Sequence, residues 1–109
     1  MYTLIALWSA PESSDEEAFE EHYQDVHAPL AANVPNLEQL ITTRATEGLE
    51  GGEPAFYRSA EMVFESQEAF HEAEESEEWT ALREDAGEVV EEFGVTLEVG
   101  IGNRNLHGE

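Results

Sequence analysis

The chain has 109 residues, enough for one domain with a single core, and its 26 Asp and Glu against four Arg and no Lys give a formal net charge of −22. That charge excludes the basic surface with which proteins usually bind nucleic acids or anionic membranes. The absence of cysteine excludes disulfides and thiolate metal sites, and no apolar run is long enough to cross a membrane, so we expect a cytoplasmic protein.

The acidic residues are expected on the surface of a folded domain. Hydrophobic residues make up 40% of the chain and include two Trp, three Tyr and five Phe, which can build a core. Self-repulsion is tolerable in concentrated salt, where the Debye length falls to about 3 Å at 1 M. Abundant Glu without Lys is typical of organisms that keep molar salt in the cytoplasm, so we predict a halophilic protein. An acidic mimic of nucleic acid is the alternative, and it requires carboxylates in phosphate-like rows.

The start of the chain predicts a strand followed by a helix. Residues 1–8 are rich in strand formers on both faces, which predicts a central strand buried on both sides. Ser14 and Glu17 have the spacing of a capping box, and apolar residues then recur every three or four positions. Because Pro29 lacks an amide hydrogen, we expect this helix to kink or break at residues 27–28.

The rest of the chain predicts three more strands and two more helices. The strands are residues 37–46, 56–64 and 95–101, with a glycine-rich hairpin loop at 47–54. Ser66 and Ser76 can cap a short helix and a longer one, and Gly94 suits the end of the second. A polar tail follows, so we expect one domain at residues 1–103 and a tail at 104–109.

This order of elements predicts an α+β fold of the ferredoxin-like, split βαβ kind (βαββαβ). Its four-stranded antiparallel sheet carries helices on one face only. No segment remains to cover the other face, so we expect a homodimer in which two sheets face each other. Such a dimeric α/β barrel would enclose a cavity between the sheets.

His27 is the first candidate for chemistry, because it lies on the apolar side of the helix where Pro29 interrupts it. Tyr23 lies one turn earlier, and the pair can orient, protonate or deprotonate a small carbonyl compound or phenol. The structural alternative is a half-buried His bonded to a backbone carbonyl. His22 lies about 140° from His27 around a regular helix, so the two are not expected to share a metal ion.

Charged residues supply further candidates. Glu61 shares a strand face with Tyr57, and if that face lines the barrel the carboxylate can act as a base or hold His27. An exposed Glu61 is the alternative. Arg44 and Arg58 are notable because cations are rare in this chain. They are expected to pair with nearby carboxylates, and binding an acidic ligand is the other option.

The segment His22-Tyr23-Gln24-Asp25-Val26-His27-Ala28-Pro29-Leu30 resembles EthD-domain proteins of the dimeric α/β-barrel superfamily. That family has an aromatic residue four positions before a His-x-Pro-Leu element. It also has a Pro-Gly/Asn-Leu turn, here Pro35-Asn36-Leu37, and a strand ending in Phe before a serine-capped helix, here residues 60–66. The resemblance covers nearly the whole chain. One departure is Leu40, where a tyrosine is often found.

The resemblance implies a ferredoxin-like homodimer with a ligand cavity beside the His-x-Pro element. We expect it to act on a small apolar or aromatic metabolite without a metal or organic cofactor. His27 would be the acid/base, Tyr23 its neighbour and Glu61 a partner, while Phe64 and Tyr57 would contact the ligand. A non-catalytic ligand-binding or accessory protein for an oxygenase system is the alternative function. Haem binding through His27 is a third.

Overall fold

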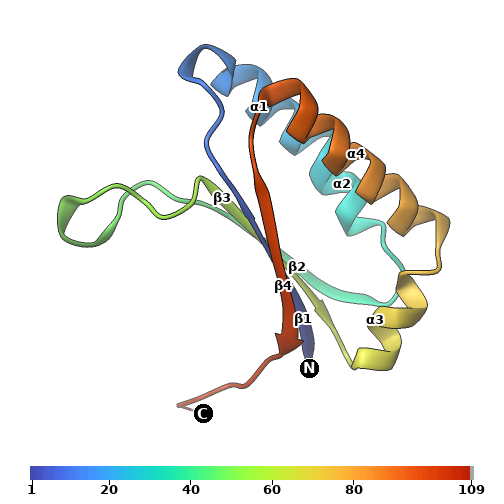
Figure 1. Cartoon of the computed structure of the whole chain (residues 1–109). Coiled ribbons are helices and arrows are strands. Elements are labelled where there is room, and N and C mark those ends of the chain that lie inside the picture. Colours follow the sequence, from blue (N-terminus) through green and yellow to red (C-terminus); the bar gives the residue numbers. More distant parts are fainter. Residues whose placement is uncertain (109) are drawn as a thin grey trace.

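The computed structural model describes residues 1–108 and has one four-stranded sheet with its helices on one side (Figure 1). The strands are β1 (Tyr2–Trp8), β2 (Leu37–Arg44), β3 (Arg58–Phe64) and β4 (Leu97–Asn103). They pair antiparallel in the order β2-β3-β1-β4. The predicted α+β, ferredoxin-like fold with an antiparallel sheet is confirmed, and β1 is a central strand as expected.

The helical layer is built from two stretches of the chain. The first consists of a 3₁₀ turn η1 (Ser13–Asp15), α1 (Glu16–His22), a π-helical turn η2 (Tyr23–His27) and α2 (Ala28–Ala32). The second consists of α3 (Gln67–Ala73) and α4 (Glu77–Phe93), and a further 3₁₀ turn, η3 (Leu49–Gly51), lies in the hairpin loop. In Figure 1 α1, α2 and α4 run side by side along the same face of the sheet.

Three of the four predicted helix-capping features are present in the structure. The hydroxyls of Ser66 and Ser76 accept hydrogen bonds from the backbone amides three residues later, at 3.1 Å in both cases. Gly94 ends α4 in the left-handed conformation with φ of 64°. The capping box at Ser14 was a wrong prediction. The chain enters α1 through the 3₁₀ turn instead, and no side chain caps the helix.

Of the kink or break expected at residues 27–28, the break is absent, because the helix continues through Pro29. Pro29 lies in the first turn of α2, where its missing amide hydrogen is not needed. The irregularity takes the form of the π-helical turn η2, which ends at His27. Such turns carry i→i+5 hydrogen bonds and often occur at functional sites. The segment therefore changes its winding while the helix remains unbroken.

The two faces of the sheet differ in their cover. On the helical face the large side chains of β1 and β3 are buried; Trp8 is 1% exposed and Phe64 is fully buried, whereas Val99 and Ile101 of the edge strand β4 are each 45% exposed. On the opposite face no helix covers β1, and Ile5 and Leu7 are 44% and 36% exposed. The prediction that β1 is buried on both sides is therefore wrong for a single chain.

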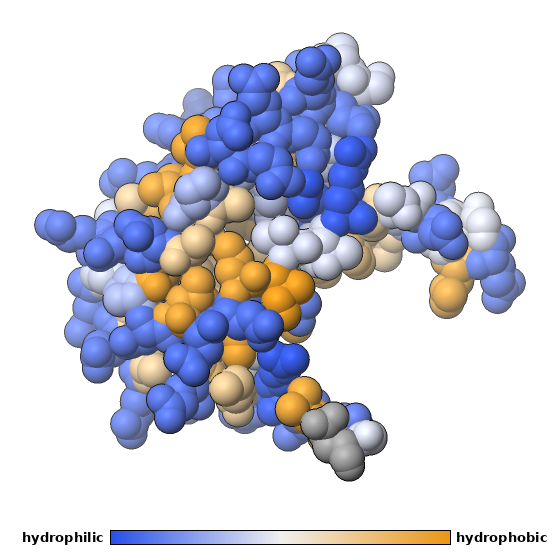
Figure 2. Space-filling view, turned by 180° about the vertical axis from the view of Figure 1, so that it is seen from behind, coloured by the Kyte–Doolittle hydropathy of each residue, from blue (hydrophilic) through white to orange (hydrophobic). Residues whose placement is uncertain are grey.

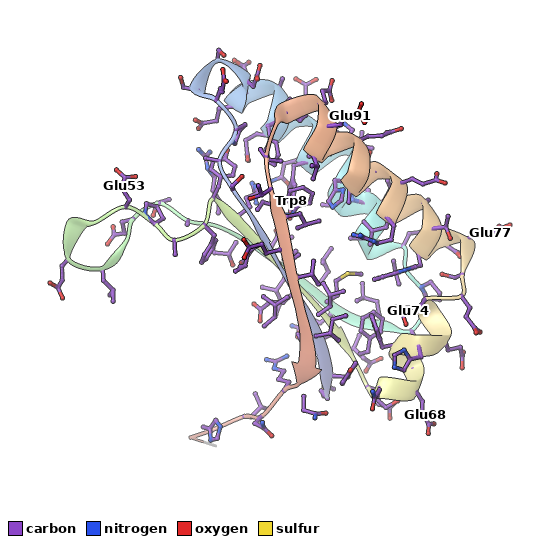
Figure 3. The ribbon with its side chains drawn as sticks, in the orientation of Figure 1. Trp8, Glu53, Glu68, Glu74, Glu77 and Glu91 are labelled. Carbon is purple, nitrogen blue, oxygen red and sulfur yellow. The ribbon has the colours of Figure 1, made fainter. Side chains whose placement is uncertain are left out.

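Acidic side chains cover the outside of the molecule. Figure 3 shows Glu53, Glu68, Glu77 and Glu91 pointing away from the body, whereas Trp8 lies between the sheet and the helices. Figure 2 shows the same division, with hydrophilic residues over the helical part and hydrophobic ones gathered in the middle of that side. Among residues 1–108 the only buried carboxylate is that of Asp85. None of the helices in these residues has the length and apolar character needed to cross a membrane.

Candidate functional site

An apolar pocket of about 230 Å³ lies between the sheet and the helical layer. All four strands contribute residues to its floor: Leu4, Ala6, Trp8, Leu40, Thr42, Ala60, Met62, Leu97, Val99 and Ile101. The helical layer contributes Tyr23, His27, Ala28, Ala31, Trp79, Leu82, Arg83 and Ala86. The pocket thus lies on the helical side of the sheet within one chain. The cavity expected between two facing sheets would be a separate space, and it stays a prediction.

The π turn brings two histidines onto one carboxylate. The Nδ1 atom of His27 is 2.8 Å from Oδ2 of Asp85, and Nε2 of His22 is 2.9 Å from Oδ1 of the same residue. In a regular α-helix residues 22 and 27 would point about 140° apart. A π turn takes up about one more residue than an α turn, so residues five apart approach the same side. The expectation that these two rings are separated fails because the helix is not regular here.

The protonation of His27 follows from its burial. Its side chain is 9% exposed and that of Asp85 is 7% exposed, whereas His22 is 27% exposed and reaches solvent. Burial lowers the pKa of His27, and the bond to Asp85 offsets this only in part. His27 is therefore neutral at pH 7. Because Asp85 accepts a hydrogen bond, Nδ1 carries the proton, and Nε2 keeps a free lone pair.

Tyr23 lies beside His27 in a cluster of aromatic rings. The two ring centres are 5.5 Å apart, and the indole of Trp8 meets the His27 ring edge-on at 5.3 Å. Burial raises the pKa of Tyr23, so its hydroxyl stays protonated and can donate a hydrogen bond. The guanidinium of Arg58 lies 4.5 Å from the centre of the Tyr23 ring. These contacts fix the orientation of both candidate side chains.

Arg58 is itself held by Glu20. Its Nε donates to the Glu20 carboxylate at 2.9 Å, and the Tyr57 hydroxyl donates to the same carboxylate at 2.8 Å. The hydrogen bond from Arg58 is the main reason that the pKa of Glu20 is lowered. Arg44 pairs with Glu16. Both arginines thus pair with carboxylates, which is the first of the two roles expected from the sequence.

The structure brings together only some of the predicted site residues. His27 and Tyr23 line the pocket. Glu61 pairs with Ile5 and lies on the opposite face of the sheet, so it does not reach His27 of the same chain. Phe64 is fully buried and packs against a neighbouring ring, and Tyr57 is bonded to Glu20; neither residue lines the pocket.

Sequence reasoning missed Asp85 and His22. Asp85 is one of 26 acidic residues, but it lies three residues after Leu82 and four before Val89, on the apolar side of its helix. A carboxylate at such a position is a usable signal, because buried charges need partners. His22 had no comparable signal, since its approach to His27 depends on the π turn.

The site does not match a metal centre or a haem pocket. Among residues 1–108 no three His, Cys, Asp or Glu side chains are arranged to hold a metal ion. The pocket volume of about 230 Å³ is below the roughly 300–1,000 Å³ of sites for drug-sized ligands, and a haem is larger than such ligands. Haem binding through His27 therefore does not fit the pocket.

Comparisons with known proteins agree with this fold. A sequence model of the EthD domain matches residues 11–92. An uncharacterised 11.0 kDa protein from the thcB-thcC intergenic region of Rhodococcus erythropolis is 32% identical over 66 residues, which are 61% of this chain and 61% of that protein. The match thus spans about three fifths of the relative's length.

Solved structures extend the comparison to almost the whole chain. An ethyl tert-butyl ether D (EthD) family protein from Bacillus halodurans is 36% identical, with a TM-score of 0.76 over 92% of this chain and 96% of that one. A dimeric ferredoxin-like protein of unknown function from Thermobifida fusca is 14% identical, with a TM-score of 0.61 over 91% of this chain and 88% of that one. The second likeness shows a shared fold alone.

Proposed function

The chain belongs to the EthD domain family, and we propose that it transfers a proton to or from a small apolar or aromatic molecule bound in the pocket, with His27 as the general acid/base. The observation that carries this proposal is the hydrogen bond between Nδ1 of His27 and the buried Asp85, at the wall of an apolar pocket. A histidine held in this way presents Nε2 to the ligand as a base.

The proposed reaction uses side chains of this chain only. Nε2 of His27 takes a proton from an O–H group, or from a C–H group next to a carbonyl, and the imidazolium that forms is stabilised by the Asp85 carboxylate. The phenol of Tyr23 donates a hydrogen bond to the ligand oxygen on which negative charge develops. The proton then returns from Nε2 to the product. No metal or organic cofactor enters this scheme.

We also propose that the protein acts as a homodimer through the uncovered face of the sheet. The exposed Ile5 and Leu7 support this, as does the dimeric state of the Thermobifida fusca protein with the same fold. Glu61 would then lie in the contact between two sheets, away from His27, and would take no part in proton transfer. Phe64 and Tyr57 would hold the pocket walls in position. A halophilic, cytoplasmic setting stays a prediction from composition.

The second candidate function is a non-catalytic protein that binds or carries such a molecule for an oxygenase or degradation system. The observation that favours it is the lining of the pocket, which is almost entirely apolar. Binding of this kind needs only the apolar walls and one hydrogen bond from His27 or Tyr23. The two functions differ in whether a proton moves.

Hydrogen exchange in the bound ligand distinguishes these functions. Aryl methyl ketones and monocyclic phenols are incubated with the protein in D₂O, and NMR follows deuterium uptake at the C–H positions next to the carbonyl or on the ring. We expect uptake with wild type and loss of it with His27→Gln, because Gln has no basic nitrogen. Glu61→Gln is the matched control and should retain the wild-type rate. Binding without uptake would contradict proton transfer and favour the carrier function.

A further inference from the structure

Two of the four arginines lie outside every ion pair in the described part of the chain. Arg44 and Arg58 each pair with a glutamate of α1. Neither Arg83 nor Arg104 forms a salt bridge within residues 1–108. A guanidinium without a carboxylate is unexpected where acidic residues outnumber basic ones 26 to four. Of these two arginines only Arg83 lines the apolar pocket.

The sequence of α4 keeps carboxylates away from Arg83. Residues three and four positions away on a helix are its neighbours on the helix surface. For Arg83 these positions hold Trp79, Thr80, Ala86 and Gly87. The same helix has seven acidic side chains among its 17 residues, so acidic residues are plentiful along it. None of them stands where it would neutralise Arg83 across one helical turn.

Arg83 and His27 are placed at different depths of one pocket. Arg83 is an exposed residue, whereas His27 is buried, so Arg83 lies at the solvent side of the pocket and His27 at its interior side. Burial is the main cause of the lowered pKa of His27, and the positive charge of Arg83 contributes to it.

An anionic ligand needs such a local cation in this protein. The formal net charge of −22 repels anions at long range. A guanidinium at the pocket reverses this repulsion over a short distance, and its planar fork matches a carboxylate with two parallel hydrogen bonds. The size of the ligand is also limited. Benzene fits an engineered cavity of roughly 150 Å³, so about 230 Å³ can hold one substituted ring.

We propose that the pocket takes a small monocyclic carboxylic acid, whose ring lies between the apolar walls and whose carboxylate pairs with Arg83. This proposal names the substrate class of the proposed function. Only the role of His27 rests on that function, because binding at Arg83 does not require any reaction. In this arrangement the carboxylate stays near solvent, and the group that exchanges a proton lies deeper, at Nε2 of His27.

The test compares benzoate with benzamide, which has the same shape without the charge. Calorimetric titrations at one fixed ionic strength measure both ligands against wild type, Arg83→Gln and Arg104→Gln. We expect wild type to bind benzoate about fivefold more tightly than benzamide. Arg83→Gln should lose that preference. Arg104→Gln removes the same charge away from the pocket and should keep it, which controls for the net charge of the whole protein.

The outcomes separate this inference from the proposed function. An equal preference for benzoate in wild type and Arg83→Gln would overturn the inference, as would a failure of wild type to bind either compound. Loss of the preference in both arginine variants would also overturn it, because the effect would then be one of net charge. If Arg83→Gln alone loses the preference while no deuterium enters the ligand, the acid-binding site stands and proton transfer fails.

Discussion

The two faces of the sheet differ in how far the chain itself covers them. On the helical face the chain alone forms a pocket, and the buried His27 there is hydrogen-bonded to Asp85 of the same chain, whereas the indole Nε1 of Trp8 has no hydrogen-bond partner among residues 1–108. On the other face apolar side chains such as Ile5 remain exposed beside Glu61, next to the side-chain-free positions Gly100 and Gly102. The first face therefore holds a pocket formed by one chain, whereas the second is left open in a single chain and is the face through which we propose that two chains meet.

Ile5→Glu should have the largest effect, because it breaks the proposed contact on the uncovered face. In a two-fold symmetric dimer each substitution occurs twice, and burying an unpaired carboxylate costs several kcal/mol. We expect wild type to sediment in molar KCl at twice the 12.2 kDa chain mass. Ile5→Glu should sediment as a monomer with an unchanged helical circular dichroism spectrum.

Val26→Glu is the matched control for this experiment. Val26 is 40% exposed, close to the 44% of Ile5, but it lies in the helical layer. The control should remain dimeric. Lowering KCl to about 0.1 M should weaken the wild-type dimer. The Debye length is then about 10 Å, so acidic side chains closer together than this repel one another with little screening. A wild-type protein that sediments as a monomer in molar KCl would remove the dimer.

Asp85→Ala should have a smaller effect, on the covered face. The substitution leaves the buried Nδ1–H of His27 without an acceptor, which typically costs about 1–3 kcal/mol of unfolding free energy. Urea unfolding in high salt measures the loss. Glu84→Ala, at the neighbouring exposed position, is the control and should change stability by less than about 0.5 kcal/mol. Equal stability of the two variants would show that the Asp85 bonds contribute nothing.

Asp85→Asn separates the structural role of this residue from its proposed catalytic role. The amide keeps the shape of the carboxylate, so the fold should lose less stability than in Asp85→Ala. Its NH₂ group donates where the carboxylate accepted, which favours the tautomer of His27 with the proton on Nε2. Deuterium uptake by the bound ligand should therefore fall although the protein remains folded.

The fold was predictable from the sequence because its signals are local. The apolar residues of β3, the serine caps at Ser66 and Ser76 and the glycine at the end of α4 each act over a few residues. Pairing of strands then follows from the order of the elements. The differences at Ser14 and at residues 27–28 concern the type of helical turn. An α-helical, a 3₁₀ or a π-helical turn can each place the same apolar residues toward the core, so the apolar pattern does not distinguish them.

The site was less predictable because it depends on contacts between distant residues. His27 and Tyr23 could be named as candidates because their helical spacing is a local signal, and both line the pocket. Asp85 lies 58 residues from His27 in the chain, and its burial appears only when α4 packs against the π turn. The sequence alone does not single out Arg83. Its lack of a carboxylate partner is known only from the structure, in which Arg44 and Arg58 do form ion pairs.

The protonation of His27 is the most direct test of the central claim. Long-range ¹H–¹⁵N NMR of wild type in high salt, with His27→Gln used to assign the signals, reports which ring nitrogen carries the proton and at what pH the ring titrates. We predict that at pH 7 Nδ1 is protonated and Nε2 is not, and that the His27 pKa lies below the usual value of about 6.5. A His27 ring that is charged at pH 7, or whose proton resides on Nε2, would contradict the assignment of His27 as the base.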